Sequence, residues 1–92
     1  MLRPNKHHID FCNRALEGVS SRIPEPLFRE VHDYINKYGE WGLGLEILIE
    51  QISEYEIKIA LAQYRLIEQA MASMGLGDSA ELQYLREHDV VD

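Results

Sequence analysis

Hydrophobic residues recur at intervals of three and four along most of this chain, which is the spacing of one face of an α-helix. The clearest example is the segment 40–54, in which one apolar stripe contains Trp41, Leu45, Leu48, Ile49 and Ile52. This pattern predicts a helix over Glu40–Glu54, and the other elements are expected to pack around it.

The same helix carries acidic residues away from its apolar stripe. Glu46, Glu50 and Glu54 are each four residues apart, so they form a ridge along one side. Leu43 and Ile47 project from that side too. An ordinary surface helix needs only one buried face, whereas this helix has two faces suited to a partner, one apolar and one acidic with aliphatic residues within it.

Two glycines inside this helical pattern require an explanation. Gly42 and Gly44 each cost about 1 kcal/mol of helix stability relative to alanine. We expect another backbone, that of a crossing helix, to approach closely at both. A phosphate-binding loop would need a preceding strand and basic or neutral neighbours, but here a helix precedes and the neighbours are Glu40 and Glu46.

The same spacing predicts further helices over 5–17, with Asn5 as the cap, over 26–38, over 60–74, and from a cap at Asp78 to about His88. The positions expected to face inward are Ile9, Cys12, Leu16 and Val19; Leu27, Val31, Tyr34, Ile35 and Tyr38; Ala60, Tyr64, Ile67, Met71 and Met74; and Leu82 and Leu85.

The segments between these helices contain turn and cap signals. Gly39 is expected to cap the second helix in the left-handed conformation, and Gly75-Leu76 to end the fourth in a Schellman motif. The segment 55–59 is expected to be an extended connector with its isoleucines inward, a short strand there having no evident partner, and 90–92 to be a loose tail. The chain is thus predicted to be all-α, a single domain over 1–92 with four main helices and a short C-terminal one.

Composition and charge narrow the range of partners. No apolar run approaches the roughly 20 residues of a membrane-spanning helix, and the N-terminus lacks a signal-peptide core, so we expect a cytoplasmic protein. The formal net charge is −7, from 16 acidic and 9 basic side chains. This charge argues against direct binding of nucleic acid or an anionic membrane and is compatible with a basic partner.

The sequence contains no convincing active site. Its one cysteine, Cys12, lies on an apolar helix face with nothing to activate it, and it also excludes an internal disulfide. A helical di-iron site needs a histidine three residues after a glutamate, and no glutamate in the chain has one. We therefore expect neither enzymatic activity nor a cofactor or metal.

The central segment resembles the MafI family of bacterial immunity proteins over roughly 31–76. The resemblance rests on Gly39-Glu40-Trp41-Gly42-Leu43-Gly44-Leu45-Glu46, Leu48, Ser53-Glu54-Tyr55-Glu56-Ile57, Tyr64, Ile67-Glu68 and Met74-Gly75-Leu76. Trp41 stands where the family more often has Tyr or Phe, and Gly44 where it has Ala. Members are small acidic helical proteins encoded beside polymorphic toxins, including toxins of contact-dependent growth inhibition.

The resemblance implies a binding protein that neutralises the C-terminal domain of a cognate toxin, often a nuclease and here expected to be a ribonuclease. The acidic face predicted from the residues alone would suit the basic surface of such a toxin. The candidate toxin-binding residues are Glu30, Asp33, Glu40, Trp41, Leu43, Glu46, Ile47, Glu50, Glu54 and Tyr55. The alternative is a helical adaptor or regulatory subunit that acts through a homo- or hetero-oligomer interface.

Overall fold

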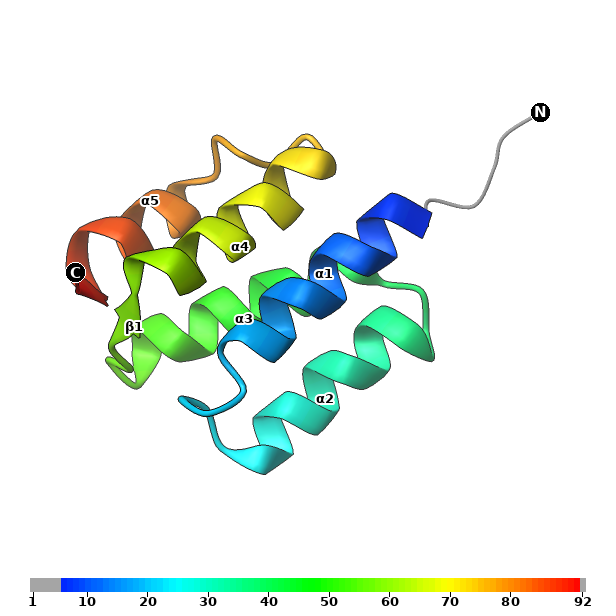
Figure 1. Ribbon diagram of the computed structural model, residues 1–92, viewed down its shortest axis with the longest axis horizontal. Coiled ribbons are helices and arrows are strands. Elements are labelled where there is room, and N and C mark those ends of the chain that lie inside the picture. Colours follow the sequence, from blue (N-terminus) through cyan, green and yellow to red (C-terminus); the bar gives the residue numbers. More distant parts are fainter. Residues whose placement is uncertain (1–5, 92) are drawn as a thin grey trace.

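Five α-helices and a pair of two-residue strands make up residues 6–91, the part of the chain that the computed structural model describes (Figure 1). The elements are α1 (Lys6–Gly18), α2 (Glu25–Asn36), α3 (Trp41–Glu54), β1 (Ile59–Ala60), α4 (Leu61–Ser73), α5 (Ala80–His88) and β2 (Val90–Val91). The all-α class is confirmed. The expected cap Asn5 lies outside the described residues, as does Asp92 of the expected tail.

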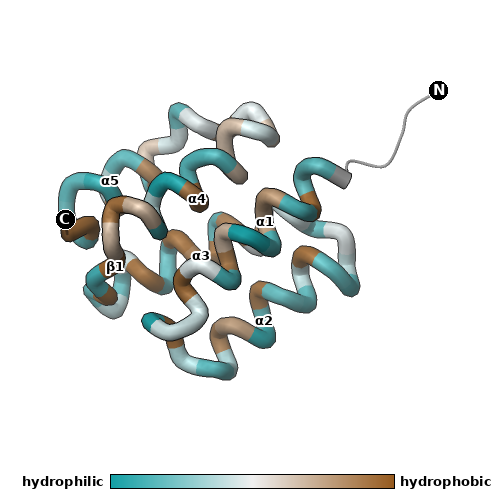
Figure 2. Tube along the Cα trace, in the orientation of Figure 1, coloured by the Kyte–Doolittle hydropathy of each residue, from teal (hydrophilic) through white to brown (hydrophobic). Residues whose placement is uncertain are grey.

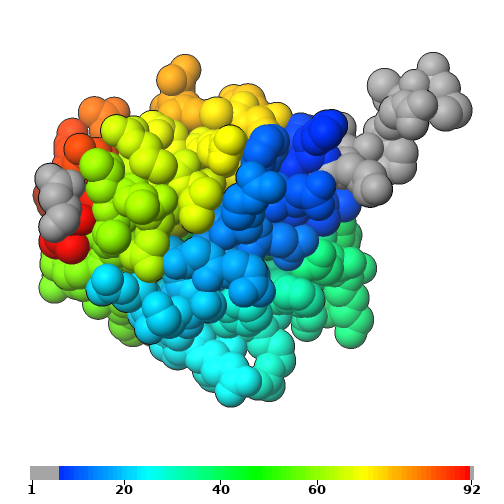
Figure 3. Space-filling model, viewed as in Figure 1, coloured from blue at the N-terminus to red at the C-terminus, as the bar shows by residue number. Residues whose placement is uncertain are grey.

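Helix α3 is the central element, because it contacts each of the other four helices. Its apolar stripe is fully buried at Leu45, Leu48, Ile49 and Ile52. In Figure 1, α1 and α4 lie in front of α3, and α2 runs beside α1. The exposed side of α3 is therefore turned away from the viewer. Figure 3 shows the face formed by α1, α2 and α4. Within residues 6–91, no helix is both long and apolar enough to cross a membrane.

The core is built from the apolar stripes of all five helices, whose hydrophobic positions recur along each helix in Figure 2. The buried residues include Cys12 and Leu16 of α1, Val31 and Ile35 of α2, Tyr64, Ile67 and Met71 of α4, and Leu82 and Leu85 of α5, all of which were predicted to face inward.

Tyr38 is the main exception among the predicted inward residues, since 58% of it is exposed. The prediction was wrong because α2 ends at Asn36, so Tyr38 lies beyond the helix and its spacing no longer places it on the apolar stripe. Gly39 does adopt the expected left-handed conformation, with a φ of 68°, and turns the chain toward α3.

The Schellman motif predicted at the end of α4 is confirmed. Gly75 has a φ of 77°, its N–H donates to the carbonyl of Ala72 at 3.0 Å, and the N–H of Leu76 donates to the carbonyl of Met71 at 2.8 Å. Leu76 then packs against the core. These bonds satisfy carbonyls that the helix end would otherwise leave without partners.

Helix α3 ends in the same arrangement without a glycine. Glu56 takes the left-handed position with a φ of 52°, and the N–H of Ile57 donates to the carbonyl of Ile52 at 2.9 Å. A side chain in this conformation is strained, because its Cβ crowds the backbone. The backbone bond and the partly buried Ile57 hold the turn in place.

The start of α5 differs from the prediction by one residue. Ser79 is the N-cap, and its Oγ accepts a hydrogen bond from the backbone N–H of Leu82 at 3.1 Å. Asp78 was predicted for this role. The capping side chain must reach an amide two or three residues further on, and because α5 begins at Ala80 that position belongs to Ser79.

The C-terminal residues are paired rather than loose. Ile59 and Ala60 pair in parallel with Val90 and Val91, which corrects the predictions of a loose tail and of a segment without a strand partner. Ile59 is fully buried, and its N–H donates to the carbonyl of Asp89 at 2.9 Å.

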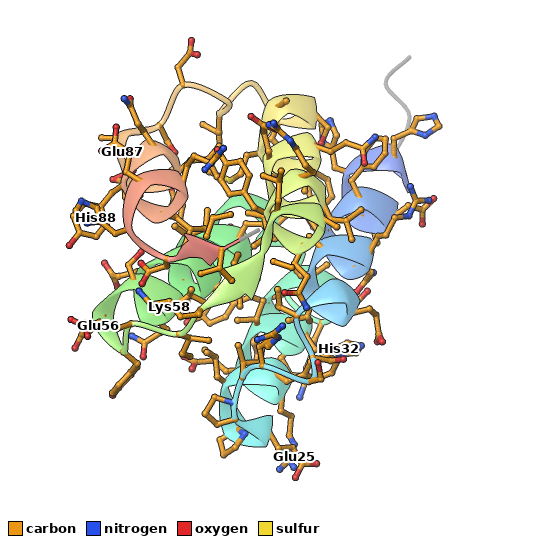
Figure 4. The ribbon with its side chains drawn as sticks, turned by 60° about the vertical axis from the view of Figure 1, so that its left-hand side comes forward. Glu25, His32, Glu56, Lys58, Glu87 and His88 are labelled. Atoms are coloured by element: carbon orange, nitrogen blue, oxygen red, sulfur yellow. The ribbon has the colours of Figure 1, made fainter. Side chains whose placement is uncertain are left out.

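A buried charge supports this junction. Asp89 is only 2% exposed, and its Oδ1 lies 3.5 Å from the Nζ of Lys58, which also donates to the carbonyl of His88 at 2.8 Å. In Figure 4, Lys58 lies against the end of α5, whereas Glu56 and His88 extend outward. Lys58 therefore ties the segment after α3 to the segment after α5.

Candidate protein-binding surface

The acidic ridge of α3 is exposed along its whole length. Glu46, Glu50 and Glu54 are all exposed, and so is Leu43, at 44%. Ile47 is partly buried against the core at the edge of this strip. The predicted two-sided character of α3 is thus present, because the opposite stripe is fully buried.

Helix α2 extends this strip because it lies close against α3. An alanine Cβ built on Gly44 would lie 3.2 Å from both Ile35 Cγ1 and Tyr34 Cβ, and 3.5 Å from the carbonyl oxygen of Val31. The close backbone approach predicted at Gly44 is therefore confirmed. The same prediction was wrong for Gly42, where a Cβ would make only an ordinary 3.6 Å contact with the Leu76 side chain.

Of the two α2 carboxylates, Glu30 lies beside the end of the ridge, because it lines a hollow together with Gln51 and Tyr55. Asp33 is half-buried and lies next to Glu30, with which it lines a second hollow beside Arg29 and Tyr38 of the α2 side. We define the α2–α3 acidic surface as the eight residues Glu30, Asp33, Leu43, Glu46, Ile47, Glu50, Glu54 and Tyr55. All of them were predicted site residues.

The two remaining predicted residues are placed differently. Glu40 is exposed in the connection between α2 and α3, where its backbone N–H donates to the carbonyl of Tyr34 at 2.7 Å. Trp41 is on the opposite side of α3 from Glu50, since nine residues at about 100° each make about two and a half turns. It packs partly buried against the core, its ring edge-on to His8 at a centroid distance of 5.5 Å. The structure does not bring Trp41 to the acidic surface.

The carboxylates of this surface are not neutralised within the described chain. The ion pairs among residues 6–91 are Arg29–Glu25, Lys58–Asp89 and Arg65–Glu68. No carboxylate of the acidic surface takes part in them. Their negative potential therefore extends into solvent, where it can act on a charged partner.

Apolar side chains are exposed beside these carboxylates. Tyr55 is 68% exposed at the end of α3, and Tyr38 and Leu43 are exposed near its other end. Tyrosine is enriched among the residues that dominate protein–protein interfaces. Tyr38 was predicted from the sequence to lie in the core. Gly39 could have indicated otherwise, because it interrupts the helical spacing just after Tyr38.

The cysteine and the possible metal ligands of the described chain do not form a reactive site. Cys12 is completely buried, and burial raises the pKa of its thiol to about 12, so it stays protonated and unreactive near neutral pH. Its predicted role in core packing is confirmed. Within residues 6–91, no group of three or more His, Cys, Asp or Glu side chains is arranged to hold a metal ion.

Comparisons with known proteins found no relative of this chain. No protein-family model matches the chain, and neither a curated protein nor a solved structure matches it.

Proposed function

We propose that this chain is an immunity protein that binds and neutralises the C-terminal domain of a cognate polymorphic or contact-dependent growth inhibition toxin, through the α2–α3 acidic surface. The observation that carries the proposal is the row of three exposed carboxylates along α3, none ion-paired within residues 6–91, with Glu30 of α2 beside the last α3 turn. The resemblance of the central segment to the MafI family supports the same role.

The chemistry of a nuclease explains why such a surface would inhibit it. A ribonuclease, the toxin that the resemblance favours, must present cations to the phosphates of its substrate. Carboxylates on a rigid helix can pair with those cations and exclude the substrate, while exposed Leu43 and Tyr55 supply apolar contact area. Opposite potentials would also speed the encounter of the two proteins.

An adaptor or regulatory subunit is the alternative, and the charge of the surface restricts it. A homodimer formed through this surface would place rows of glutamates against each other, and like charges in an interface are unfavourable. An adaptor would therefore need a basic partner of another kind. Co-purification of the chain with the product of the adjacent gene separates the two functions, because an immunity protein should retain a toxin domain.

Charge reversal at single positions tests the proposal. We expect Glu46→Lys, Glu50→Lys and Glu54→Lys to remain folded, because exposed substitutions usually change stability by less than about 0.5 kcal/mol. At least one should weaken binding of the co-expressed toxin domain by about tenfold or more, through like-charge repulsion. Titration calorimetry across a salt series gives the affinity, and growth rescue gives protection.

Glu17→Lys is the matched control, because Glu17 is exposed near the end of α1 and not on the acidic surface. It makes the same change in net charge and should leave the affinity within about twofold of wild type. If the three α3 variants fold and bind as tightly as wild type, the toxin does not bind at this surface.

A further inference from the structure

A hollow of about 560 Å³ lies where the α1–α2 turn, the first turn of α2 and the end of α3 meet. Its apolar lining comes from Pro24, Pro26, Leu27 and Ile57. It is an open hollow on the surface rather than an enclosed cavity. This groove, as we call it, adjoins the α2–α3 acidic surface through Glu30 and Tyr55, which belong to both.

The walls of the groove are held in place before any partner arrives. On one side the α1–α2 turn is anchored by the buried side chains of Val19 and Ile23. Arg22 Nη1 donates from this turn to the carbonyl of Lys58 at 3.3 Å, which links the turn to the segment after α3. On the other side the N–H of Ile57 is bonded to the last turn of α3. A preformed groove binds with little loss of conformational entropy.

The groove also has groups that a partner could engage. The Gln51 side chain makes no hydrogen bond to the rest of the described chain, so its amide is free to pair with a partner backbone. Tyr55 is the most exposed of the large apolar residues in the described chain, and it stands at the rim. Exposed aromatic area beside a hollow is typical of an anchor pocket in a protein interface.

The charge around the groove selects its occupant. Two cations lie nearby: Lys58 is ion-paired with Asp89, and Arg22, which lines the groove, donates to the neutral carbonyl of Lys58, so of the two only Arg22 keeps an uncompensated positive charge. Glu30, Glu54 and Glu56 are exposed around the same end of the molecule, and the ion pairs of residues 6–91 include none of them. A side chain that enters the groove is therefore favoured when positive charge flanks it.

We propose that the groove binds one large apolar side chain of the protein partner, at a position flanked by lysine or arginine, and that it anchors the complex. This inference rests on the proposed function, since the partner is taken to be the toxin domain. The anchor and the acidic ridge would act on different rates. Charges mainly set the association rate and its salt dependence, whereas a desolvated apolar anchor sets the dissociation rate.

The test compares groove variants with a matched surface variant in binding kinetics against the co-expressed toxin domain. Tyr55→Ala removes the rim, and Gln51→Phe fills the hollow; each should raise the dissociation rate by about tenfold or more and leave the salt dependence of association unchanged. Tyr84→Ala is the control, because Tyr84 is 52% exposed on α5 and stacks on His88 outside the groove. It should dissociate at the wild-type rate.

A peptide probe separates the two proposals. Acetyl-Lys-Phe-Lys-amide at millimolar concentration should shift the NMR signals of Leu27 and Ile57 saturably, and acetyl-Glu-Phe-Glu-amide should not. If the toxin domain binds but both groove variants dissociate at the wild-type rate, the anchor is wrong and the proposed function stands. If the toxin domain does not bind wild type, the proposed function fails. The peptide then tests the groove by itself: saturable shifts support the binding of an apolar side chain there, and their absence overturns it.

Discussion

Gly44 determines how closely α2 approaches α3, and so whether the carboxylates of the two helices form one surface. Its missing side chain lets the carbonyl of Val31 and the Cβ of Tyr34 approach the α3 backbone closely. Glycine inside a helix is unfavourable by about 1 kcal/mol, and the close packing offsets that loss. A single residue thus connects the core to the candidate binding surface.

The two glycines of α3 should respond oppositely to alanine. We expect Gly44→Ala to lower the free energy of unfolding by about 1 kcal/mol, because overpacking against Tyr34 and Ile35 outweighs the gain in helix propensity. Gly42→Ala should raise it by about 0.5 kcal/mol, because a Cβ there meets only the Leu76 side chain at an ordinary distance. Urea denaturation measures both. Stabilisation by Gly44→Ala would show that α2 and α3 are less tightly packed than described.

At the same scale, the candidate site could be predicted from the sequence where one helix face determines it. The side on which Glu46, Glu50 and Glu54 lie follows directly from helical spacing, and all three are exposed. Trp41 and Tyr38 could not be placed in this way. Their positions depend on where a helix ends and on which neighbour covers its first turn, and His8 of α1 is distant in sequence.

The elements themselves were predictable because their signals are local. Helical spacing, Gly39 and the Gly75-Leu76 stop each act within one or two turns, so the five helices and their faces follow from short stretches of sequence. The pairing of β1 with β2 is different. Two-residue strands have no measurable periodicity, and their pairing joins residues that are far apart in the sequence.

The end of α3 offers a test at the scale of the element. Glu56 occupies the left-handed position that glycine usually fills, so Glu56→Gly should raise the free energy of unfolding by about 1 kcal/mol. Glu50→Gly is the control, because Glu50 lies inside the helix and the same change there should lower it by about 1 kcal/mol. Thermal and urea melts of both variants give the comparison. Equal destabilisation by the two would mean that the segment after α3 does not hold this turn.

At the scale of the whole molecule, apolar side chains and carboxylates occupy different places. The apolar stripes meet at α3, and five of the carboxylates without an ion pair belong to the α2–α3 acidic surface, while others, such as Asp10, Glu17 and Glu87, lie on α1 and α5. A net charge of −7 alone would repel any polyanion and attract any basic protein. What would make the attraction specific is the clustering of charge on one surface, because potentials of exposed charges are screened beyond about 10 Å at 0.1 M salt.

Neutralising three carboxylates on the acidic surface, and three elsewhere, distinguishes the effect of local charge on binding from the effect of net charge. One variant combines Glu46→Gln, Glu50→Gln and Glu54→Gln, and the other combines Asp10→Asn, Glu17→Gln and Glu87→Gln at exposed positions of α1 and α5. Both lose three negative charges, so net charge alone predicts equal effects on binding. We expect the first to slow association with the toxin domain by about tenfold at low salt and to flatten its salt dependence, and the second to slow it by no more than about twofold. Stopped-flow kinetics from low to high salt measures both, and equal slowing would mean that the acidic surface only contributes to the overall charge.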